Sequence, residues 1–219
     1  MMKNIFFLLI SIAVVIILWT TPVLYPLKLL VVFFHESSHA LATILSGGDV
    51  AQLVLLKEQG GYVMSRGGSR FLVLNSGYLG SLLWGVIIYL LSVHTRLDKA
   101  ALMILGIVIA LITLGFAGSL FTIAFGIIAG ITLVLVARYL SQDISDFILR
   151  LIGLTSMLYV PLDIFSDTIS RSQLDSDARM LATEYGGTTI MWGVVWLLIS
   201  VIIIFVCLRR SMFKRSAVR

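Results

Sequence analysis

Two histidines and a glutamate lie within five residues of one apolar stretch, in the order His35-Glu36-Ser37-Ser38-His39. On a helix, residues four apart lie on the same face, so both imidazoles can bind one Zn²⁺ ion. Glu36 lies one residue round the helix from His35, where its carboxylate can reach a water molecule at the metal but is poorly placed as a ligand. That is the position of a general base. The spacing therefore predicts metal binding by His35 and His39, with Glu36 as the catalytic base.

A catalytic zinc ion usually has a third protein ligand and one open position. We select Asp163, which follows Val160-Pro161-Leu162 late in an apolar stretch and has no basic residue within seven positions on either side. Asp167 lies one turn later on the same face and is the alternative, either as the ligand or as a support to it. The remaining histidine, His94, lies among charged residues and is predicted to be a surface loop residue.

These ionisable groups belong to a chain with the composition of a membrane protein. Of its 219 residues, 59% are apolar and 12% are charged, against roughly 45–50% and 25% in soluble domains. This excludes a soluble globular domain. An ionisable side chain in the bilayer interior costs roughly 2.5–3.5 kcal/mol on insertion scales, so such groups are usually functional. A metal site therefore explains the two histidines and Glu36 better than polar packing between helices does.

The elements that position these residues are apolar segments long enough to cross a bilayer. No charged residue occurs between Ala100 and Ala137. One helix of that length would measure about 57 Å, against a hydrocarbon core of about 30 Å, so this segment must fold back into two spans. The other expected spans are Ile5–Trp19, Leu27–Leu45, Phe71–Val93, Phe147–Ser166 and Thr188–Leu208. The sequence predicts an all-α polytopic membrane protein with about six to seven transmembrane helices.

A short β-hairpin is predicted after the second of these helices. Gln52–Leu56 and Tyr62–Met64 are strand-like segments on either side of Gly60-Gly61. Three small residues spaced four apart in the next span, Gly77, Ser81 and Gly85, indicate close helix packing. In that span Asn75 is predicted to form a hydrogen bond between helices.

The rest of the chain adds no second domain. We expect one integral membrane domain over residues 1–219, with a basic tail over residues 209–219 that contains five of the sixteen lysines and arginines. Basic residues beside a hydrophobic span are typical of membrane topology and lipid headgroup contact, so nucleic-acid binding is not expected. Cys207 is expected to be a packing residue. Ser176-Asp177-Ala178 is predicted to begin a surface helix, with Ser176 as its N-cap and Asp177 in its first turn.

Taken together, these motifs resemble those of the site-2 protease group of intramembrane zinc metallopeptidases, and most closely its compact M50B-type branch. The likeness covers about residues 27–208. It is carried by H-E-x-x-H-A-L-A from His35, Gly47-Gly48, Gly60-Gly61-Tyr62-Val63, Arg66-Gly67-Gly68, Gly77-Tyr78-Leu79-Gly80-Ser81, Asp163, Asp167 and Ser176-Asp177-Ala178. The resemblance implies that His35, His39 and Asp163 bind zinc and that Glu36 activates water. The wider family has Leu-Asp-Gly at the third ligand, where this chain has Leu162-Asp163-Ile164, which leaves Asp163 and Asp167 both open.

We expect the protein to be a zinc-dependent endopeptidase that cleaves a membrane-protein substrate in or near a transmembrane segment. We also expect it to be a multi-pass protein of the cell (inner) membrane, in contact with the lipid bilayer. The alternatives are a transporter with a metal or proton pathway through the intramembrane His, Glu and Asp side chains, and an inactive relative that only binds partners. The basic tail predicts a cytoplasmic C-terminus, whereas the resemblance predicts the opposite orientation, with zinc open to the cytoplasm.

Overall fold

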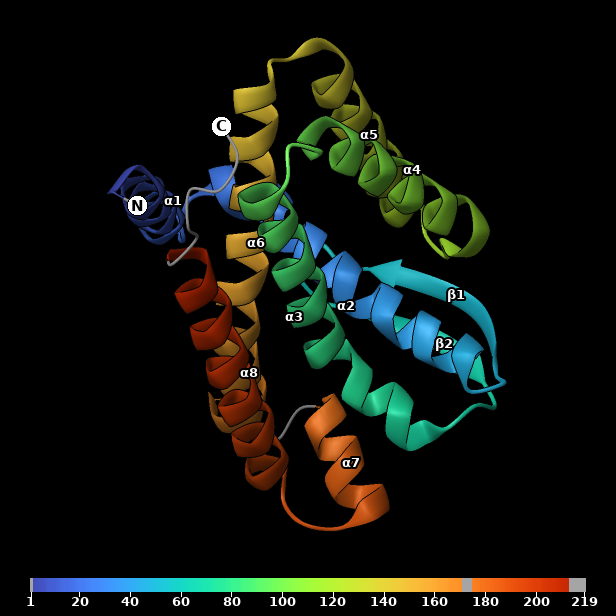
Figure 1. The fold of residues 1–219 in the computed structure, drawn as a ribbon. Coiled ribbons are helices and arrows are strands. Elements are labelled where there is room, and N and C mark those ends of the chain that lie inside the picture. The colour runs from blue at the N-terminus through green and yellow to red at the C-terminus, as the bar shows by residue number, and fades with distance from the viewer. Residues whose placement is uncertain (1, 171–174, 213–219) are drawn as a thin grey trace.

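The computed structural model describes residues 2–170 and 175–212, which form eight α-helices and one β-hairpin (Figure 1). The helices are α1 (Met2–Ile17), α2 (Tyr25–Leu45), α3 (Arg70–His94), α4 (Asp98–Phe116), α5 (Leu120–Tyr139), α6 (Gln142–Phe165), α7 (Asp177–Tyr185) and α8 (Thr189–Met212). The strands are β1 (Asp49–Leu55) and β2 (Gly61–Arg66). A 3₁₀ turn, η1 (Pro22–Leu24), precedes α2, and a π-helical turn, η2 (Ser166–Ser170), follows α6.

Within these described residues, five helices are long and apolar enough to cross a membrane: α3, α4, α5, α6 with part of η2, and α8. The chain is therefore a multi-pass membrane protein, and the mostly helical fold with a hairpin after the second helix is confirmed. The expected number of spans was six to seven. The two helices that were also expected to be spans, and that are not among these five, are α1 and α2. Helix α1 has only 16 residues, and α2 carries the histidines and Glu36 and is buried along much of its length.

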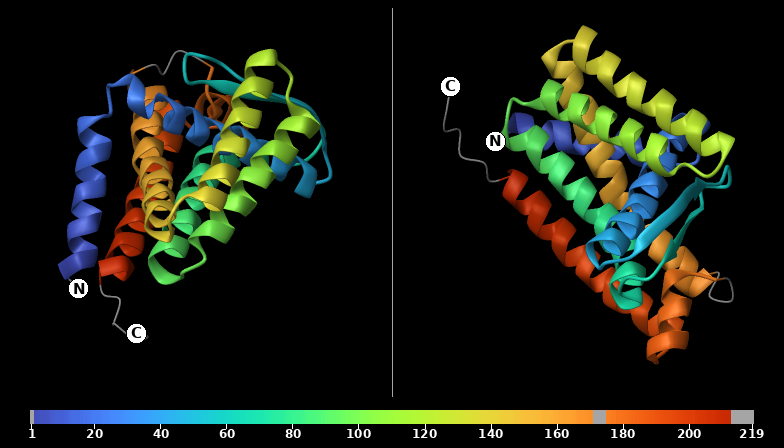
Figure 2. Two further views of the ribbon diagram at one scale, coloured as in Figure 1. Left: turned by 90° about the horizontal axis from the view of Figure 1, so that it is seen from above. Right: turned by 90° about the vertical axis from the view of Figure 1, so that its right-hand side faces the viewer.

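The bundle is held together by close contacts between helices. Gly85 of α3 faces Gly153 of α6, and a Cβ on Gly85 would lie 3.0 Å from the Gly153 carbonyl oxygen. Next to this contact the Ser156 hydroxyl donates to the Ser81 carbonyl oxygen at 2.8 Å. Small residues let the two helix backbones approach closely, as predicted for Ser81 and Gly85, whereas Gly77 of the same stripe faces the His35 and His39 rings. A second close pair joins α4 to α5, which lie together at one side of the bundle (Figure 2).

The hairpin lies along α2 (Figure 1). The outer edges of its two strands differ in how far other elements cover them. β1 and β2 are antiparallel, with Leu53 opposite Val63. The other edge of β1 is partly covered by the corner between α4 and α5, where the Gly118 N–H donates to the Leu53 carbonyl at 2.8 Å and the Leu55 N–H donates to the Thr122 hydroxyl at 2.8 Å. β2 is therefore the strand with the more open outer edge, and most of its residues are exposed.

The polar and sulfur-containing side chains singled out in the sequence lie as predicted. The Trp196 indole N–H of α8 donates to the Asn75 side-chain oxygen of α3 at 2.9 Å, so Asn75 does join two helices. Cys207 is buried and unpaired. Arg209 and Arg210 of the predicted basic tail are the last-turn basic residues of α8, and the remainder of that tail lies outside the described residues.

Candidate metal centre

Helix α2 presents His35, Glu36 and His39 from one regular helical segment. Its start has Pro26 in the first turn, where a missing N–H costs nothing, and its end is followed by Gly47 at φ +84°. The two imidazole rings lie 4.7 Å apart between their centroids. They face α3 at Gly77, where an added Cβ would overlap the Nε2 atoms of both rings. The space beside the histidines therefore exists because α3 has no side chain at that position.

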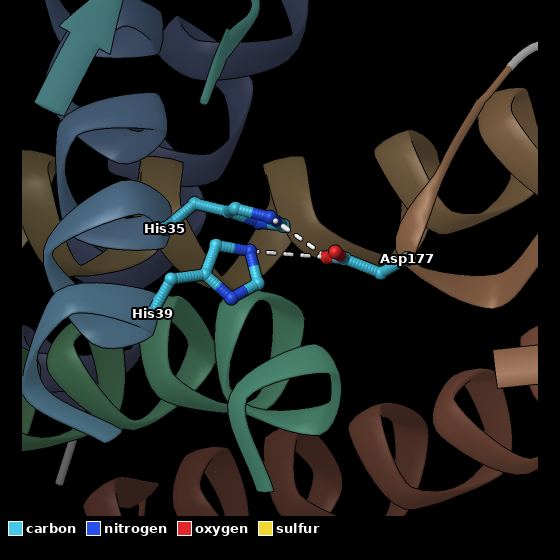
Figure 3. Close-up of side chains that lie close together, drawn as sticks. All are labelled: His35, His39 and Asp177. Atoms are coloured by element: carbon cyan, nitrogen blue, oxygen red, sulfur yellow. Dashed lines mark hydrogen bonds and ion pairs between the residues drawn. The ribbon is translucent and has the colours of Figure 1, made fainter. Parts of the chain in front are cut away.

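The third member of the cluster is Asp177, the first residue of α7. The Ser176 hydroxyl caps this helix by accepting from the Arg179 N–H at 3.3 Å, as the sequence predicted. The Asp177 side chain points from α7 toward α2, and its Oδ2 atom lies 3.1 Å from His35 Nε2 and 3.2 Å from His39 Nε2 (Figure 3). One ligand atom from each of the three residues lies within 4.8 Å of the others. The three side chains therefore form a group that could hold a metal ion.

The protonation of His39 tests whether a cation fits this group. His39 Nδ1 lies 2.7 Å from the Val73 carbonyl oxygen. A carbonyl only accepts, so Nδ1 carries the proton, and in a neutral imidazole Nε2 is left as a lone pair. That lone pair faces the Asp177 carboxylate oxygen at 3.2 Å, an arrangement that needs a positive charge between the two atoms. A proton on Nε2 supplies that charge in the metal-free site, and a metal ion would take the place of that proton. A backbone carbonyl on the other ring nitrogen is the usual partner of a metal-binding histidine.

The separations are also those of ligands around one small ion. Zinc binds histidine nitrogen and carboxylate oxygen at about 2.0–2.2 Å in tetrahedral geometry, which sets neighbouring ligand atoms about 3.3 Å apart. The two distances from Asp177 Oδ2, 3.1 and 3.2 Å, lie within a few tenths of an ångström of that value. The donor set and spacing thus fit a divalent metal, with two imidazoles and a carboxylate as ligands.

The electrostatics keep Asp177 in its metal-binding form. In the metal-free site, burial by itself would raise the pKa of the Asp177 carboxyl, but the positive charge of protonated His39 and the hydrogen bonds from His35 and His39 lower it by more. The net pKa lies below the ordinary value, so this carboxyl is ionised at neutral pH, as a metal ligand must be.

Glu36 is buried beside the cluster, with 4% of its surface exposed. It is packed against the hairpin at Gly61, where an added Cβ would lie 2.7 Å from the Glu36 Oε1 atom. Both residues line a cavity of about 510 Å³ that also contains the two histidines and Asp177. β2 contributes residues to the same wall. The cavity therefore joins the candidate metal ligands, a buried carboxylate and the more open strand of the hairpin.

The other carboxylates predicted from sequence lie in this cavity without joining the cluster. Asp163, which we selected as the third ligand, and Asp167 both line the wall. The Tyr78 hydroxyl donates to Asp167 Oδ2 at 2.6 Å, and the Tyr78 ring makes an edge contact with His35. The structure brings a different carboxylate, Asp177, to the histidines. Ligation by Asp163 stays a prediction. His94 is the exposed last residue of α3, consistent with its predicted surface position.

The sequence does contain a signal for Asp177. Ser176-Asp177-Ala178 is among the motifs that carry the M50B-type resemblance, although its residue types by themselves predict only a helix start. The selection of Asp163 depended on the cost of a carboxylate in hydrocarbon, and that argument does not apply to α7, which lies outside the candidate spans. The cost of burying charge in hydrocarbon therefore does not indicate a metal ligand in the polar segment after α6.

Comparison with known families bears on this geometry. A family model described as Peptidase M50B-like matches residues 8–207, which is most of the chain. The chain belongs to the Peptidase M50B-like family. Searches of curated proteins and of solved structures gave no match.

Membership of this family implies a metallopeptidase and confirms the resemblance inferred from the motifs. The match extends over all five candidate spans almost to the end of α8, and it includes His35, His39 and Asp177. The chain is thus an M50B-like protein with three side chains that could hold a metal ion.

Proposed function

We propose that this M50B-like chain is a zinc-dependent intramembrane endopeptidase in which His35, His39 and Asp177 bind the metal and Glu36 is the general base. The observation that carries the proposal is the meeting of Asp177 with both histidine Nε2 atoms, at 3.1 and 3.2 Å, inside a cavity that also contains the buried Glu36. Two histidines and a carboxylate are an established ligand set for catalytic zinc.

When bound, zinc supplies a Lewis acid that polarises a peptide carbonyl and makes a water molecule acidic enough to ionise near neutral pH. The side chains supply the rest. Glu36 accepts the proton of the attacking water and passes it to the leaving amine. Its burial keeps bulk water from competing for that carboxylate. The Val73 carbonyl fixes the orientation and tautomer of His39.

The hairpin is the element that we propose binds the substrate in an extended form. A helical peptide bond is shielded by its own hydrogen bonds, so a transmembrane segment must be unwound before it is cut. β2 has the more open edge of the hairpin and lines the cavity with Gly61, Tyr62 and Val63. We propose that a substrate segment adds to β2 as a further strand, which would carry its backbone past Glu36. N-methylation of single amides in a peptide substrate should then raise KM in an alternating pattern. A flat response along the peptide would exclude strand addition.

The test of the function is a pair of variants of the purified protein, Glu36→Gln and His35→Ala. Glu36→Gln should keep the zinc content of the wild type and lose roughly 10²–10⁴-fold in cleavage of a membrane-protein substrate, because only proton transfer is removed. His35→Ala should lose the metal as well. Wild-type cleavage by Glu36→Gln would refute the assignment of the base. Metal or proton flux in liposomes without any cleavage would favour the transporter alternative.

A further inference from the structure

Helix α7, which carries Asp177, packs against α3 (Figure 1). A small set of side chains joins α7 to the start of α3. Arg70 Nε lies 3.1 Å from one Glu184 carboxylate oxygen and 3.3 Å from the other. Arg70 Nη2 also contacts the Met180 sulfur at 3.0 Å. Phe71 packs edge-on against Tyr185, with ring centroids 5.3 Å apart. The last two turns of α7 are thus held by the first two residues of α3.

The same end of α7 is joined to α8 through the glycine corner Gly186-Gly187, which does not by itself fix the direction of the helix. Gly186 and Gly187 both have positive φ values, +87° and +85°. Glycine adopts this conformation freely, so the corner permits several directions for α7. The Trp192 indole N–H donates to the Gly186 carbonyl at 3.1 Å. The position of Asp177 therefore depends on the packing of α7 against α3 and α8, and the contacts of Arg70 and Phe71 are part of that packing.

Arg70 itself is fixed by the junction between β2 and α3. Gly67 and Gly68 turn the chain with φ values of +72° and +76°, and the next residue, Ser69, donates its N–H to the Ser46 hydroxyl at the end of α2 at 2.9 Å. The start of α3 is in this way tied to the helix that carries the two histidines. The contact between Arg70 and Glu184 therefore links the position of α7 to that of α2, the helix that carries the two histidines.

From this arrangement we propose that Arg70 is a positioning residue for the metal centre: its ion pair with Glu184 holds α7 in the orientation that brings Asp177 to His35 and His39. The proposal rests on the function proposed above. Glu184 lies seven residues after Asp177, about 10 Å along the helix axis. A small tilt of α7 about this contact moves the Asp177 carboxylate by several tenths of an ångström, whereas metal–ligand distances vary by only about 0.2 Å.

The contribution of the Arg70–Glu184 ion pair to zinc binding is limited by the solvent exposure of the two side chains. The Arg70 and Glu184 side chains are 48% and 38% exposed, so solvent screens their attraction. A pair of this kind changes an equilibrium constant by at most about fivefold. Loss of the pair should therefore weaken zinc binding by about two- to fivefold, and should lower kcat with it, without abolishing the site.

The experiment is a double-mutant cycle on the purified full chain, with Zn²⁺ affinity measured by competition with a chromophoric chelator. Arg70→Ala and Glu184→Ala should each weaken binding by about two- to fivefold, and the double variant should be no weaker than either. The charge exchange of Arg70→Glu with Glu184→Arg should restore most of the affinity. Arg150→Ala is the matched control, because it removes the 2.7 Å ion pair with Asp146 within α6, and it should bind zinc as the wild type does.

Arg70 also lines the cavity, so a direct contact with substrate is the competing explanation. Glu184 is not part of the described cavity wall, which makes Glu184→Ala the deciding variant. Wild-type zinc affinity in Glu184→Ala, or a change confined to KM in Arg70→Ala, would overturn the positioning role. If the wild type itself binds no zinc while remaining folded, the proposed function fails instead, and this inference falls with it.

Discussion

Gly77→Ala is predicted to destroy the metal centre without touching any of its ligands. A Cβ at Gly77 would overlap both Nε2 atoms and would lie 2.6 Å from His35 Cε1, whereas ordinary contact begins at 3.4 Å. The His35 ring must therefore move by about 0.8 Å, roughly four times the tolerance of a metal–ligand distance. Helix α3 itself is not weakened, because alanine favours a helix over glycine by up to about 1 kcal/mol. We expect zinc affinity to fall by at least about 100-fold.

The assay is chelator competition on the purified variant, with thermal unfolding measured alongside it. Gly115→Ala is the matched control, because an added Cβ there meets no atom within 4 Å. Gly85→Ala overpacks the same helix against Ser156, at 2.8 Å, and should lower stability by about 1–3 kcal/mol while keeping zinc. Zinc affinity in Gly77→Ala within twofold of the wild type would refute the placement of α3 against the two rings.

Three further outcomes are expected. Asp177→Asn should weaken zinc binding by about 100-fold or more, whereas Asp163→Asn should leave it within a few fold; the reverse order in a chelator titration would make Asp163 the ligand. A strong chelator should abolish cleavage and added Zn²⁺ should restore it, whereas full activity after verified metal removal would exclude a metallopeptidase. Asn75→Ala leaves the buried Trp196 indole N–H without its acceptor and should cost about 1–3 kcal/mol in unfolding at unchanged zinc content; zinc loss in that variant would contradict a purely structural role.

The half of the site on α2 could be predicted from sequence because its geometry is local. Helical periodicity alone sets His35 and His39 on one face, with Glu36 beside them, and the structure retains that relation. The hairpin after α2 and the close packing at Gly85 were likewise predictable, since each depends on residue types within one short segment.

The third carboxylate could not be derived in this way, because its position depends on tertiary packing. Asp177 lies 142 residues after His35 and reaches it through the docking of α7 on α3 and α8. The cost of charge in hydrocarbon points to Asp163, which lines the cavity, and its ligation of a metal stays a prediction. That cost says nothing about a carboxylate on a peripheral helix. The five candidate spans are likewise counted by length and composition: α1 has only 16 residues, and α2 carries its histidines and Glu36 among apolar residues, so neither is among them.

The most direct test of the central claim is the zinc stoichiometry of the purified protein and of its Asp177→Ala variant, measured by mass spectrometry of the metals after removal of loosely bound ions. Ligation by His35, His39 and Asp177 predicts close to one zinc per chain in the wild type and nearly none in a folded Asp177→Ala protein. Equal zinc in the two proteins, or none in the wild type, would contradict the metal centre and the peptidase activity proposed from it.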